Sequence, residues 1–141
     1  MKRDCVHIGK MLRMGRMFPE SHPYALFVDL SFTSSTGPFP KLRSFNDVAS
    51  SLVKRVDVLI IDPGQIERNP ALFAGNDKAR ILIRLDWTNA FRGKDYPLPS
   101  HKIRYGSVAD CSFAICSGAD GVVISYLLGY GDDIEMDSFN N

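Results

Sequence analysis

The stretch YGSVADCSFAICSGADGVVISYLLGYGDDIE, residues 105–135, decides the fold class predicted for this chain. Ser107 is a favourable N-cap for a helix whose apolar residues are spaced by three and four, and Gly118 supplies the left-handed conformation that ends helices. Residues 121–128 form an apolar run typical of a strand covered on both faces in a parallel sheet. The polar loop 129–133 follows at the carboxyl end of that strand, where α/β folds bind ligands. The stretch therefore predicts one helix, strand and loop unit of a parallel α/β fold.

Similar units precede this one along the chain. Apolar runs typical of strands occur at residues 24–31, 56–62 and 81–86. A helix is predicted at 44–55, where Ser44 is the N-cap, and a shorter one at 65–75, which Pro70 interrupts. Strands that are joined through helices pair in parallel by right-handed crossovers. The sequence therefore predicts about four parallel β/α units in a single domain, residues 1–141.

Two segments lie outside this repeat. Residues 6–18 are basic and rich in methionine, and two glycines weaken a long helix there. We expect a short helix or an irregular segment that covers the bottom of the sheet, within an amino-terminal cover segment 1–23. The loop 89–104 is longer than most loops of compact domains. His101, within this loop, is either a catalytic base or a solvated loop residue.

The composition is that of an ordinary globular domain. The chain is 45% apolar and 23% charged, and its formal charge of +1 gives no reason to expect nucleic acid or a membrane as a partner. No apolar run approaches the roughly 18 residues of a membrane-spanning helix, and the amino terminus lacks the apolar core of a secretory signal. The three cysteines have no metal-site spacing and are expected to fill core positions. We therefore expect a cytoplasmic protein.

An acid ends each of the first three predicted strands. These acids are Asp29, Asp62 and Asp86, and the carboxyl ends of parallel strands place them along one rim. Asp29 is followed by a loop rich in Ser, Thr, Gly and Pro, so it is either a cap of nearby backbone amides or a general acid/base or orienting carboxylate. A magnesium site is another interpretation of the rim, although the spacings match no metal motif and we assign no metal.

A set of short motifs carries a resemblance over nearly the whole chain. In order, they are residues 8–18 (IGKMLRMGRMF), 25–29 (ALFVD), Gly37-Pro38, 118–123 (GADGVV), Gly129 and Glu135. In this order and spacing they resemble the amino-terminal half of class I fructose-bisphosphate aldolases of the archaeal, DhnA-like type. The related aldolase and thiolase that acts on phosphorylated autoinducer-derived sugars is similar in the same places.

The resemblance implies half of a TIM (β/α)8 barrel, about four of its strands. It implies a carbon–carbon lyase that acts on small phosphorylated sugars without a cofactor, through a Schiff base between a lysine of the sixth strand and the substrate ketone. The family acid that assists proton transfer corresponds to Asp29, and the family's Asp-His-Gly reads Asp29-Leu30-Ser31 here. The residues that we expect to bind substrate are Ser31, Asp62, Asp86 and Tyr126.

The resemblance also implies that residues 1–141 lack parts of the family's catalytic machinery. The family's Schiff-base lysine, its tyrosine acid/base and its phosphate-binding loops would all lie beyond Asn141. None of the lysines at 41, 54, 78, 94 and 102 falls at the end of a predicted strand. We therefore expect an isolated chain that is inactive or nearly so. Half a barrel leaves two strand edges unpaired, so we expect self-association or pairing with a complementing half-barrel.

Two other functions are compatible with the same residues. One is a small α/β binding or regulatory domain whose acidic rim of Asp29, Asp62 and Asp86 binds magnesium. No Gly-rich phosphate-binding motif follows any predicted strand, which weighs against this alternative. The other is a catalytically inactive barrel fragment that serves as an interaction protein.

Overall fold

The computed structural model describes residues 2–18, 20, 23–37, 44–93, 103–131, 133, 135, 136 and 140. His101 and the lysines at 41, 94 and 102 lie outside these residues. The elements are α1 (Lys2–Met17), β1 (Phe27–Asp29), α2 (Phe32–Thr36), α3 (Phe45–Leu52), β2 (Val58–Ile61), α4 (Pro63–Arg68), α5 (Pro70–Phe73), β3 (Arg80–Arg84), β4 (Asp86–Thr88), β5 (Tyr105–Ser107), α6 (Cys111–Cys116) and β6 (Gly121–Val123). Among the described helices, none combines the length and the apolar character that crossing a bilayer requires.

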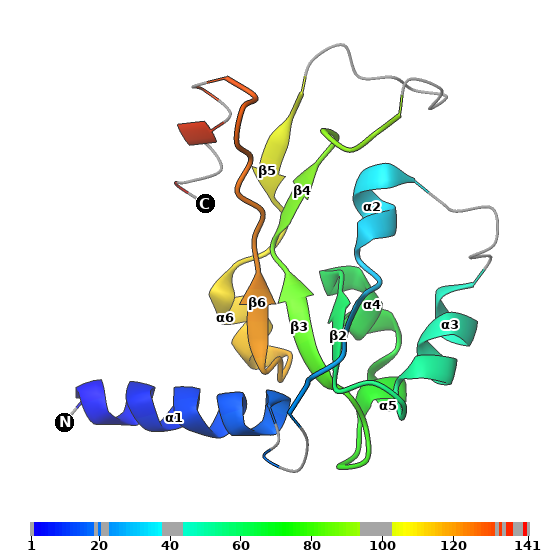
Figure 1. Ribbon diagram of the computed structural model, residues 1–141, viewed down its shortest axis with the longest axis vertical. Coiled ribbons are helices and arrows are strands. Elements are labelled where there is room, and N and C mark those ends of the chain that lie inside the picture. Colours follow the sequence, from blue (N-terminus) through cyan, green and yellow to red (C-terminus); the bar gives the residue numbers. More distant parts are fainter. Residues whose placement is uncertain are drawn as a thin grey trace.

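Four strands form a parallel sheet in the order β1-β2-β3-β6, at the centre of Figure 1. Neighbouring strands are all parallel, which confirms the predicted parallel α/β arrangement. Ile60 of β2 lies opposite both Asp29 of β1 and Leu82 of β3. Gly121 of β6 lies opposite Leu82, and a Cβ at Gly121 would come within 2.7 Å of the Leu82 side chain. Glycine at this position therefore allows β6 to pair with β3.

The main core lies between one face of this sheet and the helices. Alternate residues of the central strands point to that face and are fully buried, among them Leu59, Ile61 and Ile83. Ile66 of α4 and Ala114 of α6 pack against them. Burying a Leu or Ile side chain contributes about 1.5–3 kcal/mol, so this layer holds the helices on the sheet. The N-cap predicted for α3 is confirmed, because the Ser44 hydroxyl accepts the Asp47 amide at 3.4 Å.

The amino-terminal helix is longer than predicted. The sequence favoured a short helix or an irregular segment, whereas α1 is a continuous helix of 16 residues. Its last residue, Met17, is buried against Val58 and Leu82 at the amino end of the sheet. Arg16 lies 3.6 Å from the Asp120 carboxylate, immediately before β6. These contacts fix the carboxyl end of α1 against the sheet.

The carboxyl-terminal unit differs from its prediction in two ways. The helix cap is Asp110, whose carboxylate accepts the Phe113 amide at 2.7 Å, and Ser107 belongs to β5 instead. Gly118 has a φ of +79°, so the predicted left-handed stop is confirmed. The predicted strand 121–128 contributes only β6, and it is half-exposed instead of covered on both faces. The neighbour of β6 is β3, and the chain continues from β3 into β4, which pairs with β5. Strand β6 therefore has a partner for only three residues.

A second sheet was not predicted. Strands β4 and β5 pair antiparallel, with Asp86 opposite Ser107 and Thr88 opposite Tyr105. Figure 1 shows this pair extending beyond the carboxyl end of β3. Asp86 therefore begins β4 instead of ending a single strand, and only Leu85 separates it from β3.

Three smaller predictions are also corrected. The strand predicted at 24–31 contains only the three residues of β1. The interruption predicted at Pro70 is confirmed, since α4 ends at Arg68 and α5 begins at Pro70, but the first of these helices begins at Pro63 and not at residue 65. Cys111 and Cys116 are exposed instead of buried, because both lie on the surface of α6.

Candidate functional site

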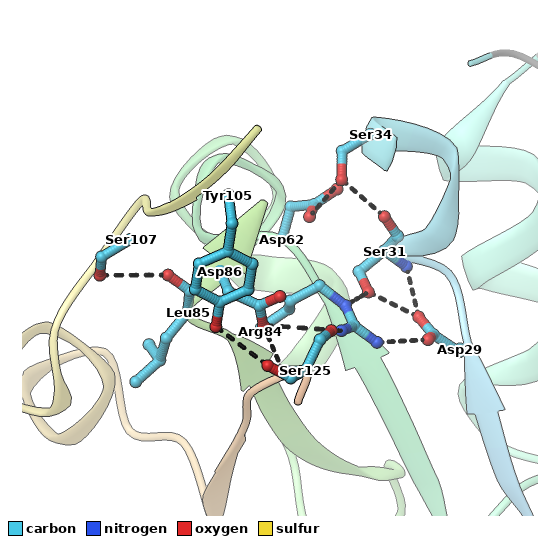
Figure 2. Close-up of polar contacts among 10 residues, drawn as sticks. All are labelled: Asp29, Ser31, Ser34, Asp62, Arg84, Leu85, Asp86, Tyr105, Ser107 and Ser125. Atoms are coloured by element: carbon cyan, nitrogen blue, oxygen red, sulfur yellow. Dashed lines mark hydrogen bonds and ion pairs between the residues drawn. The ribbon is translucent and has the colours of Figure 1, made fainter. Parts of the chain in front are cut away.

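Arg84, the last residue of β3, connects the polar residues at the carboxyl end of the sheet. Its guanidinium donates from Nη2 to Asp29 Oδ2 at 2.8 Å, from Nε to Ser31 Oγ at 2.6 Å and from Nη1 to Ser125 Oγ at 2.9 Å. Figure 2 shows it between Asp29 on one side and Ser125 on the other. Only 13% of the Arg84 side chain is exposed, so these bonds replace most of its hydration. Arg84 thereby ties β1 and β3 to the segment that follows β6.

Asp29 has hydrogen bonds on both of its carboxylate oxygens. Oδ1 accepts the Ser31 amide at 2.8 Å and the Ser31 hydroxyl at 2.6 Å, while Oδ2 accepts Arg84. The bonds to Ser31 are the backbone capping that the sequence predicted as one alternative for Asp29. They fix the turn that leads from β1 into α2.

Asp86 is the most buried of the three rim acids. Its residue exposure is 2%, and Oδ1 accepts the Ser125 amide at 3.0 Å and lies 3.7 Å from Arg84 Nη1. The Tyr105 hydroxyl donates to the Ser125 carbonyl at 3.0 Å and joins β5 to the same segment. One guanidinium is thus shared by two carboxylates, Asp29 and Asp86.

Asp62 has a different environment. It lies at the start of α4 but makes no side-chain cap there, and the Ser34 hydroxyl is 3.2 Å from its Oδ1. The pKa of Asp62 is raised to about 6, mainly by burial and to a smaller extent by the charge of Asp29, against the Ser34 hydrogen bond and the charge of Arg84, which lower it. This carboxyl can therefore gain or lose a proton close to neutral pH.

Two cavities adjoin these acids. The larger, about 680 Å³, lies between the starts of α4 and α6. Its lining residues are Ser34, Asp62, Pro63, Gly64, Gln65, Glu67, Arg68, Asp86, Trp87, Val108, Ala109, Asp110 and Phe113. The smaller, about 270 Å³, lies beside Asp29 and is lined mainly by apolar residues of α2 and α3. The Trp87 indole donates to the Ser34 carbonyl at 2.9 Å and so holds α2 at the edge of the larger cavity.

The structure brings four of the five predicted site residues to one edge of the sheet. They are Asp29, Ser31, Asp62 and Asp86. Tyr126 is 54% exposed and is not among the partners of Arg84 within the described part of the chain. The contacts themselves do not assign a catalytic or a substrate-binding role to these residues.

Sequence reasoning missed Arg84, which connects the others. A signal was available, because Arg84 interrupts the apolar run ILIRLD of residues 81–86. With a period of two it shares a strand face with Leu82 and Asp86, and a charge on a mostly buried strand needs partners. Ser34 and Ser125 carried no comparable signal, since serines in loops are common.

The described residues contain no group of three or more His, Cys, Asp or Glu side chains that could hold a metal ion. Arg84 lies between Asp29 and Asp86, within 4 Å of both carboxylates. A cation at that position would face a guanidinium, so the geometry does not favour a magnesium site on this rim.

Comparison with known proteins gives one relationship. No family model matches the chain. An uncharacterized aldolase of Saccharolobus solfataricus is 29% identical over 127 residues, which cover 89% of this chain and 45% of that protein. The chain thus spans less than half the length of this relative.

Proposed function

We propose that this chain is part of an aldolase-type (β/α)8 barrel that forms or breaks a carbon–carbon bond in small phosphorylated sugars. The observation that carries the proposal is the four-stranded parallel sheet, which brings Arg84 and the three acids Asp29, Asp62 and Asp86 together at its carboxyl end. Active sites of β/α barrels lie at that end, because the loops there are free to carry chemistry. The similarity to an uncharacterized aldolase supports the same assignment.

In this proposal the reaction proceeds through a Schiff base of the class I, DhnA-like type. A lysine amine attacks the substrate ketone and water leaves; the iminium then accepts the electron pair of the breaking carbon–carbon bond. Lys54 and Lys78 cannot be this lysine, since Lys54 follows α3 and pairs with Asp77, and Lys78 precedes β3 at the amino end of the sheet. Lys2 and Lys10 belong to α1, which closes the amino end of the sheet. Lys41, Lys94 and Lys102 fall at the end of no predicted strand, so we propose that another part of the barrel supplies the lysine.

The remaining part of the barrel would cover a surface beside β6. Figure 1 shows α1 running past the β6 edge, and its exposed apolar residues include Ile8, Met11 and Leu12. A groove of about 210 Å³ lies between α1 and α6, and Ile115 and Val122 are exposed along it. Exposed apolar surface of this kind marks an interface. We propose that a complementing β/α segment, in the same polypeptide or a separate one, pairs with β6 there.

The test compares the 141-residue chain with a chimaera that adds the remaining carboxyl-terminal part of the S. solfataricus relative. Each protein is incubated with dihydroxyacetone phosphate and borohydride and analysed by mass spectrometry, and fructose 1,6-bisphosphate cleavage is assayed in parallel. We expect an adduct and cleavage only in the chimaera. An adduct on Lys54 or Lys78 of the isolated chain would contradict the assignment of the lysine, and a folded chimaera without an adduct would contradict the aldolase assignment.

The interface is tested separately by light scattering after size-exclusion chromatography. We expect the isolated chain to associate through the β6 surface, and Ile115→Lys to reduce that association. Ser50→Lys, at an exposed position of α3 away from β6, is the matched control and should leave the mass unchanged. A monomer that unfolds sharply and is unaffected by Ile115→Lys would argue against an incomplete barrel.

A further inference from the structure

Asp62 differs from the other two rim acids in what it contacts. Asp29 and Asp86 both lie within 4 Å of Arg84, whereas Asp62 makes no ion pair within the described residues. Its one side-chain hydrogen bond there is with the Ser34 hydroxyl. Asp62 also lines the larger cavity, so a small molecule in that cavity could reach its carboxyl group.

The charge of the cavity lining restricts which ligands fit. Four carboxyl groups line it, those of Asp62, Glu67, Asp86 and Asp110, against the single guanidinium of Arg68. A phosphate group would meet repulsion from this lining, because like charges a few ångströms apart disfavour each other. The phosphate of a phosphorylated substrate is therefore expected to bind elsewhere.

The rest of the lining suits a small neutral molecule that carries hydroxyl groups. Trp87, Val108, Ala109 and Phe113 provide aromatic and aliphatic surface that can contact C–H groups. The carboxyl groups on the same walls can accept hydrogen bonds from hydroxyls. A volume of about 680 Å³ is within the usual range of small-molecule sites.

We propose that the cavity between α4 and α6 binds a small neutral hydroxy-carbonyl compound, and that the Asp62 carboxyl donates a hydrogen bond to the carbonyl oxygen. This inference rests on the proposed function, in which the ligand corresponds to the hydroxy-carbonyl part of the substrate and not to its phosphate. In this arrangement the Asp62 carboxyl is the proton donor, while Asp29 holds Arg84 in position. Asp62 would then stabilise negative charge that develops on that oxygen.

The protonation state of Asp62 is consistent with this role. The pKa of about 6 reflects burial, with Ser34 and Arg84 lowering it and Asp29 raising it. Glu67, Arg68, Asp86 and Asp110 face the same cavity. The carboxyl group is therefore mainly a donor at pH 5 and mainly a carboxylate at pH 7.5.

The experiment measures dihydroxyacetone binding to the isolated, isotope-labelled 141-residue chain by NMR at pH 5 and pH 7.5. For a pKa of about 6, the protonated fraction falls from about 0.9 to about 0.03, so we expect binding about thirty-fold weaker at pH 7.5. Asp62→Asn should bind equally at both pH values, because its amide is a donor throughout. Glu67→Gln, on the same lining, should retain the wild-type pH dependence.

A second variant tests the contact that positions Asp62. The Ser34 hydrogen bond lowers the pKa of Asp62, so Ser34→Ala should move the midpoint of the binding curve to higher pH. Equal wild-type binding at both pH values, no binding at pH 5, or a pH dependence that persists in Asp62→Asn would overturn the proposal. Inorganic phosphate that shifts the Trp87 indole signal would also overturn it. The borohydride test does not depend on these outcomes, so failure of the inference and failure of the proposed function are distinguishable.

Discussion

The two ends of the same parallel strands differ in how their buried side chains are packed. At the amino end, Val58 and Leu82 are buried under Met17 of α1. At the carboxyl end, the next residue of β3 on the same face is Arg84, which binds Asp29 and other polar groups. One end is closed by apolar contact and the other carries ionisable groups beside a cavity.

The physical basis of this difference is how each end compensates for lost hydration. Apolar burial at the amino end needs no partner of particular geometry. Arg84 at the carboxyl end is stable only while each bond to its acids and serines is present, because unpaired buried charge is costly. The carboxyl end should therefore be the more sensitive to single substitutions.

Arg84→Met should have the largest effect and would sharpen this comparison. It leaves Asp29 and the buried Asp86 without their shared guanidinium, and removing one partner of a buried ion pair costs about 3–5 kcal/mol. We expect a loss of that size in the free energy of unfolding, measured by urea denaturation. Arg80→Met removes the same charge from the other end of β3 and is the control. Equal losses in the two variants would show that the carboxyl end has no special sensitivity.

Met17→Ala tests the amino end. Met17 is 7% exposed, and removal of a buried Met side chain costs about 2 kcal/mol or more. The free energy of unfolding should fall by that amount without a change in its pH dependence. Met14→Ala, on the same helix with 43% of the residue exposed, should change it by less than about 0.5 kcal/mol. Similar losses from both variants would mean that α1 is not closing the amino end through Met17.

Asp62, at the carboxyl end, should dominate the pH dependence of stability between about pH 4 and pH 6. The folded-state pKa of Asp62, about 6, is higher than its unfolded value near 3.8, so the folded state binds more protons between these values. The stability that Asp62 contributes is therefore fully present below about pH 4, and it is lost as the pH rises through about 6. Solvent screening at this partly exposed group limits the loss to about 1–2 kcal/mol. Asp62→Asn should remove this slope in urea titrations at several pH values, and a slope that remains would place its origin elsewhere.

The smallest effect is expected at a surface ion pair away from both ends. Lys54 Nζ lies 2.5 Å from Asp77 Oδ2, but the two side chains are 60% and 62% exposed. The hydrogen bond from Lys54 lowers the pKa of Asp77, yet exposed pairs rarely contribute to stability. Lys54→Met should leave the thermal midpoint unchanged. A clear decrease in the thermal midpoint would mean that exposed ion pairs also stabilise this fold. The number of ion pairs, and not their burial, would then explain the importance of Arg84.

Local pattern was sufficient for part of the fold and of the site. Apolar runs and caps such as Ser44 predicted the parallel strands and α3, and the position of Asp29 and Asp62 after apolar runs predicted their common edge. Patterns of this kind arise from neighbours within a few residues, which a sequence displays directly. The β4–β5 pair joins segments that residues 89–104 separate along the chain, so its pairing was not visible in this way.

The sequence by itself determined that strands and helices alternate, that the strands are parallel, and that acids follow them, because side-chain periodicity and helical crossovers leave few alternatives. Only the tertiary structure decided what each acid contacts. It placed Arg84 between Asp29 and Asp86 and left Asp62 beside a cavity with a serine as its partner. The pKa of a carboxyl group depends on burial and on charges brought from distant segments, and those are properties of the folded chain.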